Sequence, residues 1–283
     1  MAVRERILTM GITGSGKSYQ WLKMAESLLP TGAIFRCIDT DNAIDFMLEH
    51  QFSKLMPENG GNVYVFNVYD WQDYKIGLEW MMQGKVDPKQ LTPMQKKAYG
   101  MPVKPDDWNI IDMIDNAWST VQKYFVSEIF EESIGDYFLN ARKELRSRGD
   151  VDKKGKPAVS VMPETLSGWM DWPVVNKLYD DWILPIVYRS KCHLYATTKV
   201  QQLSGFDKKD PEIMSLFGGH GVRPSGQKNI GHQTHTIFLM IPGNNEWYVS
   251  TIKDRGGREY FKKDKLTSLF FQYLVGKAHW DIP

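Results

Sequence analysis

Short apolar runs alternate with a helix-like segment along the first part of the chain. The runs of strand length are residues 6–10, 33–38, 62–67 and 108–112. Between the first two, residues 17–29 carry apolar side chains every three or four positions, which is the period of an amphipathic helix. Pro30 and Gly32 then end that helix. Buried strands separated by helical segments predict an α/β fold with a mainly parallel sheet and helices on both faces.

The second half of the chain continues this pattern with longer segments. Residues 118–145 follow the period of one long helix, residues 192–200 suit a further core strand, and residues 266–274 suit an amphipathic helix. Residues 236–241 and 246–252 flank Pro-Gly-Asn-Asn, a combination that predicts a late β-hairpin.

A single domain spanning residues 1–283 accommodates all of these segments. Three polar or glycine-rich stretches interrupt it near residues 84–105, 142–160 and 204–231. They predict insertions or mobile loops. For the first stretch a lid and a solvated surface loop are both open, and we favour the surface loop.

The composition excludes several classes of protein. Lysine and arginine number 35 against 34 for aspartate and glutamate, so the net charge of +1 gives no bulk attraction to nucleic acid or to an anionic membrane. Cys37 and Cys192 are too few for a disulfide scaffold, and their apolar surroundings in sequence predict buried free thiols. The chain shows no secretory signal and no apolar run near the ~20 residues of a membrane span, so we expect a cytoplasmic protein without a membrane partner.

The first strand leads into a phosphate-binding motif. Residues 11–18 read Gly-Ile-Thr-Gly-Ser-Gly-Lys-Ser, which fits G-x-x-x-x-G-K-[ST] between a strand and a helix. Glycines let backbone N–H groups surround phosphate, the lysine contacts the β- and γ-phosphates, and the serine hydroxyl ligates Mg²⁺. We therefore expect ATP and Mg²⁺ as cofactors. The expected nucleotide-binding residues are Gly11, Thr13, Gly14, Ser15, Gly16, Lys17, Ser18 and Tyr19.

An acidic motif lies at the end of the apolar run at residues 108–112. Such a strand ending in aspartate suits a Walker B carboxylate, which holds the Mg²⁺ shell. Asp112 ends the shorter run and Asp115 a longer one, so both are candidate metal residues. We favour Asp112, with Asp115 capping a helix that starts at Ala117.

The run from Gly11 to Asp45 resembles the RecA/RadA family of P-loop ATPases. It has a P-loop, a helix, a strand and then the acidic pair Asp39 and Asp41. The resemblance implies that Asp41 is the carboxylate that activates the attacking water. The family usually has glutamate there, and aspartate is one methylene shorter. The alternative is that Asp39 and Asp41 cap the following helix.

The same resemblance assigns residues later in the chain. It implies that Thr198, or else Gln201 or Gln202, senses the γ-phosphate, and that Lys253 and Arg255 reach the nucleotide of a neighbouring subunit. A Lys-Asp-Arg-Gly turn late in the chain is similar to that of the short RecA-core recombination and annealing ATPases of phages. The order of five elements over residues 1–260 carries the resemblance, and a phage protein would act in the bacterial host cytoplasm.

The resemblance also implies DNA contacts at two loops. The basic residues that these loops supply are Arg142, Lys143, Arg146, Arg148, Arg223 and Lys228. A solvated charge run is the alternative for the first loop, near residues 142–157. The implied function is an ATPase that assembles into a ring or filament on single-stranded DNA, with nucleotide at subunit interfaces. The alternatives are a nucleotide-gated DNA-binding scaffold with little turnover, another P-loop motor, or a phosphotransferase.

Overall fold

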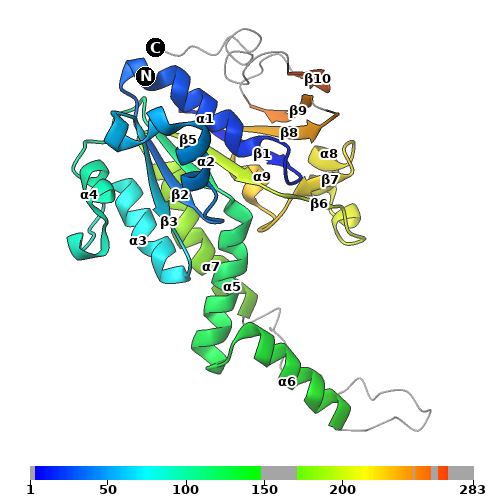
Figure 1. Ribbon diagram of the computed structural model, residues 1–283. Coiled ribbons are helices and arrows are strands. Elements are labelled where there is room, and N and C mark those ends of the chain that lie inside the picture. The colour runs from blue at the N-terminus through cyan, green and yellow to red at the C-terminus, as the bar shows by residue number, and fades with distance from the viewer. Residues whose placement is uncertain (1–3, 148–170, 245, 256–260, 267–283) are drawn as a thin grey trace.

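The computed structural model describes residues 4–147, 171–244, 246–255 and 261–266, and an eight-stranded sheet lies at its centre (Figure 1). The strand order is β10-β9-β8-β1-β5-β4-β2-β3, and a separate pair joins β6 to β7. The strands are β1 (Arg6–Gly11), β2 (Phe35–Asp39), β3 (Val63–Asn67), β4 (Trp108–Asp112), β5 (His193–Thr198), β6 (Val200–Gln202), β7 (Val222–Pro224), β8 (Thr236–Pro242), β9 (Trp247–Asp254) and β10 (Asp264–Lys265).

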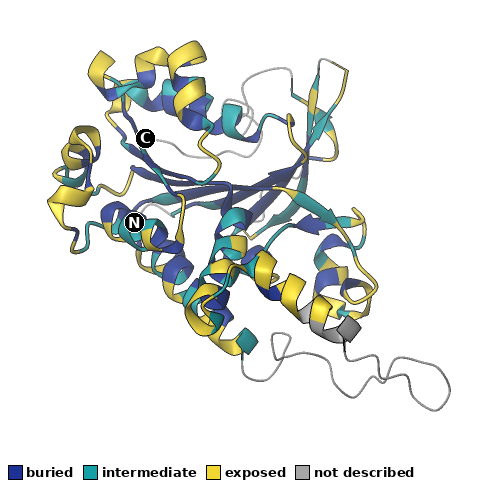
Figure 2. Cartoon of the chain, turned by 60° about the horizontal axis from the view of Figure 1, so that its bottom comes forward, coloured by how far each residue is buried: buried dark blue, intermediate teal, exposed yellow. Residues whose placement is uncertain are grey.

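Helices cover both faces of the sheet. They are α1 (Lys17–Leu28), α2 (Ile44–Gln51), α3 (Trp71–Met82), α4 (Pro93–Tyr99), α5 (Ile114–Phe130), α6 (Ile134–Ser147), α7 (Asp171–Leu184), α8 (Pro211–Phe217) and α9 (Ile230–Gln233). The 3₁₀ turns are Leu29–Thr31, Ser53–Leu55, Pro57–Asn59, Pro88–Gln90 and Asp207–Lys209, and a π-helical turn, Pro185–Arg189, follows α7. Figure 2 shows the buried strands enclosed between helices whose outer sides are exposed.

Alternation along the strands divides the interior into two cores. Leu8 and Met10 of β1 pack in the core that includes α3, α5 and α7. Ile7 of β1 and Phe35 and Cys37 of β2 pack in the core under α1 and α2. Because side chains alternate with a period of two, the last residues of β2 and β4 fall on the α1 face. The sheet thus directs its carboxyl-end side chains towards the P-loop helix.

The expected fold class is confirmed. Strands β1 to β5 and β8 pair in parallel, and β8 and β9 form the late antiparallel hairpin. Strand β5 lies between the P-loop strand β1 and the acid-bearing strand β4. These features are those of an α/β fold with a mainly parallel sheet, helices on both faces and a late hairpin. In the part of the chain that the structure describes, no helix is both long enough and apolar enough to span a membrane.

The single helix expected over residues 118–145 is wrong, because the structure has two. Helix α5 ends at Phe130, and Glu131 takes a left-handed conformation with φ of 53° before α6 begins. The left-handed residue stops the helical hydrogen bonding and turns the chain. Helix α6 extends away from the rest of the molecule (Figure 1). Asp115 lies in the first turn of α5 rather than capping a later helix.

Residues 84–105 are largely exposed, as their polarity predicts, but they contain α4 and several buried side chains. Thr92 and Gln95 form a capping box that starts α4. The Gln95 amide donates to the Val65 carbonyl of β3 at 3.3 Å, and Leu91 and Ala98 are buried. Strand β3 is an edge of the sheet, so this contact covers backbone that would otherwise be open to pairing.

The stretch 204–231 is also more ordered than its glycine content predicts. It contains α8, β7 and the start of α9. Asp210 caps α8 by accepting from the Glu212 and Ile213 amides at 3.0 and 3.3 Å. The expected helix at 266–274 lies outside the described residues except for Leu266, and Cys37 and Cys192 are buried free thiols as expected.

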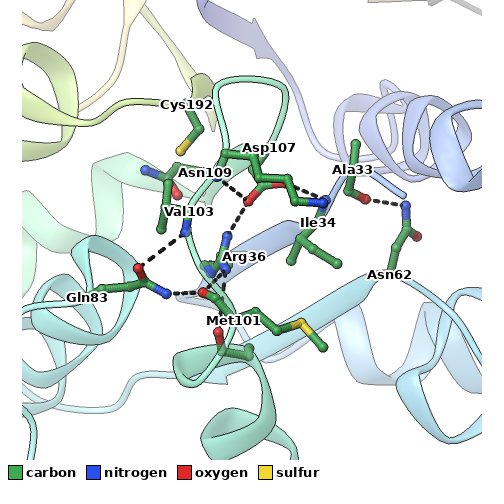
Figure 3. Close-up of polar contacts among 12 residues, drawn as sticks. Ala33, Ile34, Arg36, Asn62, Gln83, Met101, Val103, Asp107, Asn109 and Cys192 are labelled. Carbon is green, nitrogen blue, oxygen red and sulfur yellow. Dashed lines mark hydrogen bonds and ion pairs between the residues drawn. The ribbon is translucent and has the colours of Figure 1, made fainter. Parts of the chain in front are cut away.

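A fully buried ion pair fixes the amino ends of β2 and β4. Arg36 donates to Asp107 at 2.9 Å, and both side chains are inaccessible to solvent (Figure 3). The guanidinium also donates to the carbonyls of Met101 and Ala98 at 3.1 and 3.4 Å. Asp107 in turn accepts from the amide of Ile34 at 2.9 Å. The pair therefore joins the sheet to the segment that follows α4.

Replacing Arg36 tests this constraint. We expect Arg36→Ala to lower the free energy of unfolding by about 3–5 kcal/mol, because Asp107 is left buried without its cation. Urea denaturation measures the change. Lys54→Ala is the control, since Lys54 is exposed and pairs with Glu26 at the surface, and it should change the stability by under about 1 kcal/mol. Equal effects of the two substitutions would contradict the role of the buried pair.

Candidate nucleotide site

The P-loop joins the carboxyl end of β1 to α1. Gly14 and Gly16 have φ of 77° and 85°, a left-handed conformation that glycine adopts without steric strain. A Cβ on Gly11 would lie 2.7 Å from the Met240 carbonyl oxygen, so the strand end requires glycine there. Thr13 and Gly14 are exposed, and Ser15 is buried. The loop thus presents its tip to solvent directly before a helix N-terminus, a geometry that suits phosphate.

The Lys17 ammonium lies inside the P-loop. It donates to the carbonyls of Gly11 and Ile12, both at 3.0 Å, and to the Ser15 hydroxyl at 3.4 Å. The residue is only 6% exposed. Burial lowers the pKa of Lys17, while three neighbouring carboxylates raise it; they belong to Asp112, Asp115 and Asp41. The loop therefore holds a cation that faces an acidic group of side chains.

Two hydrogen bonds hold Asp112 at the end of β4. It accepts from the Trp21 indole at 2.8 Å and from the Thr197 hydroxyl. Burial raises the pKa of Asp112, and these donors together with the nearby Ser18 side chain oppose the rise. The proximity of Ser18 places this carboxylate beside the hydroxyl predicted to ligate Mg²⁺. Sequence analysis did not anticipate Trp21 or Thr197, whose apolar surroundings indicated only core packing and strand.

Asp39 organises the turn that leads into α2, although the N-cap residue of that helix is Ala43, which makes no side-chain cap hydrogen bond. The Asp39 carboxylate accepts from the amides of Asp41, Asn42 and Ile44 at 3.2, 3.0 and 2.9 Å. Burial and the charge of Asp112 raise the pKa of Asp39 to about 7. Asp41 is exposed in the turn that Asp39 organises. Asp39 is therefore a buried residue that stabilises the turn, whereas Asp41 is accessible to a ligand or to water.

Asp115 faces the same site from the first turn of α5. The residue is 7% exposed, and its Oδ1 has no hydrogen-bond partner in the described part of the chain. A buried carboxylate oxygen without a donor requires water or a cation. Mg²⁺ prefers carboxylate, hydroxyl and water oxygens together with substrate phosphates. The oxygen atoms of Ser18, Asp112 and Asp115 therefore fit Mg²⁺ chemistry.

An aromatic pair adjoins the phosphate loop. The ring of Tyr19 stacks on that of Trp247 at 6.2 Å between centroids with 19° between planes. Trp247 also covers Gly16, because a Cβ on that glycine would lie 3.4 Å from the indole nitrogen. Trp247 is 39% exposed. Sequence analysis named Tyr19 but missed Trp247, which approaches only because the hairpin folds back over α1.

The candidate sensor Thr198 faces away from the P-loop. Its hydroxyl donates to the carbonyls of Lys199 and Ser225 at 3.2 and 3.3 Å. The alternation of β5 sets Thr198 on the face opposite Thr197, which contacts Asp112. The alternatives Gln201 and Gln202 lie in β6, which pairs with β7 outside the main sheet.

Lys253 and Arg255 contact their own chain at the end of α9. The Lys253 ammonium donates to the carbonyls of Gly231, His232 and Thr234 at 2.6, 3.4 and 2.7 Å. Arg255 is exposed and donates to the His232 carbonyl at 3.3 Å. Burial and the charge of Arg255 lower the pKa of Lys253 to about 8. In this conformation the lysine stabilises a helix end.

The predicted DNA-contact residues fall into different settings. Lys143 on α6 and Lys228 are exposed. Arg223 is buried and donates to Asp207 at 3.1 Å, so its charge is used inside the protein. Arg142 and Arg146 lie within α6 with side chains outside the described set, and Arg148 lies outside the described residues.

Comparison with known proteins finds similarity among solved structures alone. No protein-family profile and no curated protein sequence matches the chain. Among solved structures it is similar to the RadB recombinase, with a TM-score of 0.44 and 10% identity over 90% of this chain and 83% of that chain. It is also similar to the ATPase domain of a phage helicase, with a TM-score of 0.40 and 10% identity over 95% and 82% of the two chains. Similarity at this level says nothing of activity.

The raised pKa of Asp39 predicts a pH dependence of stability. A carboxyl with a higher pKa in the folded state stabilises the fold while it is protonated. That contribution is complete below the ordinary pKa of 3.8 and is lost as the pH rises through about 7. We expect the unfolding free energy of the wild type to fall more between pH 4 and pH 7 than that of Asp39→Asn. Asp45→Asn, at an exposed site, should keep the wild-type slope, and equal slopes for all three proteins would contradict this assignment.

Replacing Lys17 tests whether the P-loop binds nucleotide. Lys17→Ala removes the cation that the loop holds, so we expect Mg·ATP affinity to fall at least about tenfold, on the scale of a charged hydrogen bond. Calorimetric titration measures the affinity, and circular dichroism checks the fold. Lys23→Ala, further along α1, is the control and should bind normally. Wild-type affinity in Lys17→Ala would remove the P-loop from the binding site.

Proposed function

We propose that this protein is a Mg²⁺-dependent ATPase that acts on single-stranded DNA in recombination or strand annealing. One arrangement carries the proposal: the Lys17 ammonium lies inside the P-loop, and the carboxylate of Asp112 lies near both this cation and the Ser18 side chain. A cation for phosphate and oxygen ligands for a metal thus meet at the carboxyl end of a parallel sheet. That edge is where open α/β sheets bind their ligands.

Different residues bind the phosphates, hold the metal and accept the proton in the proposed hydrolysis. Lys17 and the P-loop amides bind the phosphates, Ser18 contacts the metal, and Asp112 orders the metal's surroundings. Bound Mg²⁺ neutralises charge on the β- and γ-phosphate oxygens. Tyr19 and Trp247 offer a stacking surface for the nucleotide base. Asp41, the accessible acid after β2, accepts the proton of the attacking water.

An exposed aromatic among lysines supports the choice of single-stranded DNA. Phe206 is 81% exposed, and Lys208 and Lys209 beside it are exposed as well. Single-strand binding combines stacking of bases on aromatic rings with cations for the backbone phosphates. Lys143 and Lys228 supply further exposed cations. The net charge of +1 requires that binding depend on such local groups.

We also propose assembly into a ring or filament with nucleotide at the subunit interfaces. Arg255 is exposed at the end of β9 and is the candidate for contact with a neighbouring nucleotide. Lys253 would first have to leave the α9 carbonyls that it now contacts. A cation supplied in trans raises phosphoryl-transfer rates by roughly 10³–10⁵-fold.

A nucleotide-gated DNA-binding scaffold is the second candidate. The observation that favours it is the position of Asp41, which is exposed and has a shorter side chain than glutamate. Such a protein would bind Mg·ATP and DNA but turn over slowly. Phosphate release with and without single-stranded DNA separates the two candidates, because only the ATPase should be stimulated. The absence of Mg·ATP binding would contradict both.

A substitution at Asp41 tests the proposed chemistry. A general base contributes roughly 10²–10⁴-fold, so Asp41→Asn should reduce kcat by that factor and leave Mg·ATP affinity unchanged. Asp45→Asn, an exposed acid in the first turn of α2, is the control. If Asp41→Asn hydrolyses ATP at the wild-type rate, Asp41 is not the base.

A further inference from the structure

Thr40 directly follows β2 and lies beside the end of β4. Asp39, the last residue of β2, is the register partner of Asp112, the last residue of β4. The next amide along the chain, that of Thr40, donates to the Asp112 carbonyl at 2.6 Å. The bonding between the two segments therefore continues beyond the strands, and it sets the Thr40 side chain against Met113.

The Thr40 hydroxyl uses its whole hydrogen-bonding capacity in this position. It donates to the Met113 carbonyl at 2.7 Å and accepts from the Met113 amide at 3.0 Å. The side-chain amide of Asn116 donates to the same hydroxyl at 3.1 Å and to the Thr40 carbonyl at 3.2 Å. A hydroxyl offers one donor and two acceptor sites, so all three are occupied. An apolar side chain of the same shape would take this partner away from the Met113 backbone and from the Asn116 amide.

These contacts join two segments that carry candidate acids. Thr40 directly precedes Asp41, the proposed base, and Met113 directly follows Asp112. The charge of Asp41 also raises the pKa of Asp112, which indicates that the two carboxylates share one neighbourhood. One hydroxyl thus links the segment of the proposed base to the segment of the proposed metal-side carboxylate.

The backbone around Thr40 determines where the Asp41 carboxylate lies. Asp41 is exposed, so surrounding side chains do not enclose it. Its amide donates to the Asp39 carboxylate at 3.2 Å, and the next residue, Asn42, has a left-handed φ of 57°. The turn is therefore tight, and a displacement of Thr40 would move Asp41 with it.

We propose that Thr40 is a positioning residue for hydrolysis, which holds the Asp41 carboxylate at a fixed place relative to Asp112. This inference rests on the proposed function, because it takes Asp41 as the group that accepts the proton of the attacking water. Thr40 acts through Asp41 and contacts no reacting atom itself. Misplacing a reacting group by about 1 Å can cost about 100-fold in rate, so loss of the hydroxyl should slow the chemical step and leave binding nearly intact.

Three substitutions isolate the contribution of the hydroxyl. Thr40→Val keeps the shape and removes the hydroxyl, whereas Thr40→Ser keeps the hydroxyl. Thr31→Val is the matched control, because the Thr31 hydroxyl also donates to a backbone carbonyl, that of Leu28 at 2.7 Å, but precedes the opposite end of β2. Thr40→Val should lower kcat roughly 10- to 100-fold and change the Kd of a non-hydrolysable Mg·ATP analogue by less than about twofold. Thr40→Ser should recover most of the lost rate, and Thr31→Val should match the wild type in both measurements.

A double-mutant cycle tests whether Thr40 acts through Asp41. If it does, adding Thr40→Val to Asp41→Asn should cause no further loss of kcat, because residues that act as a unit have non-additive effects. Hydrogen exchange gives a readout that needs no turnover. The Met113 amide should exchange faster in Thr40→Val than in the wild type or Thr40→Ser, since the hydroxyl that accepts from it is gone.

The outcomes distinguish this inference from the proposed function. Additive losses in the double variant would overturn the inference, and so would a wild-type kcat in Thr40→Val or equal losses in Thr40→Val and Thr40→Ser. A wild type that hydrolyses no ATP would instead overturn the proposed function. If Thr40→Val melts below the assay temperature, Asn116→Ala takes its place in the cycle, because it removes a donor to the same hydroxyl. Additive losses of Asn116→Ala and Asp41→Asn would likewise overturn the inference.

Discussion

The parallel register of β2, β4, β5 and β1 is the constraint on which the candidate site depends. Asp39 pairs with Asp112 across β2 and β4, and Met10 pairs with Thr198 across β1 and β5. This alignment ends the strands at one level and sets Asp39, Asp112 and Thr197 on the α1 face. A shift of one residue in any strand would turn that strand's terminal side chain to the other face.

Asp112 links this register to the chemistry of the P-loop. Its carboxylate accepts hydrogen bonds from Trp21 of α1 and Thr197 of β5, and the Ser18 side chain of α1 lies near it. These donors stabilise the ionised form that a metal site needs, against the burial that raises its pKa. The same contacts lock α1 against the centre of the sheet. The carboxylate of Asp112 therefore both stabilises the packing of α1 on the sheet and contributes to the candidate nucleotide site.

Several charges that sequence reasoning would assign to ligands are used internally. Arg223 forms a buried ion pair with Asp207, and Lys253 contacts backbone carbonyls near α9. Burying an unpaired charge is strongly unfavourable, so such groups need internal partners. Lys199 and Lys208, in contrast, are exposed, and within the described part of the chain neither ammonium group forms an ion pair. Burial and pairing thus distinguish structural from functional charge.

The sequence alone determined the P-loop, the order of strands and helices, and the late hairpin, because glycine spacing and apolar periodicity are local properties. Tertiary structure decided what depends on contacts between distant segments: Gln95 covering the edge of β3, Trp247 over Gly16, and Arg223 paired with Asp207. It also decided that Thr197 rather than Thr198 contacts Asp112, since which face a residue occupies follows from strand pairing. Composition could not reveal these pairings, because identical residue types suit a solvated surface and a buried partner equally well.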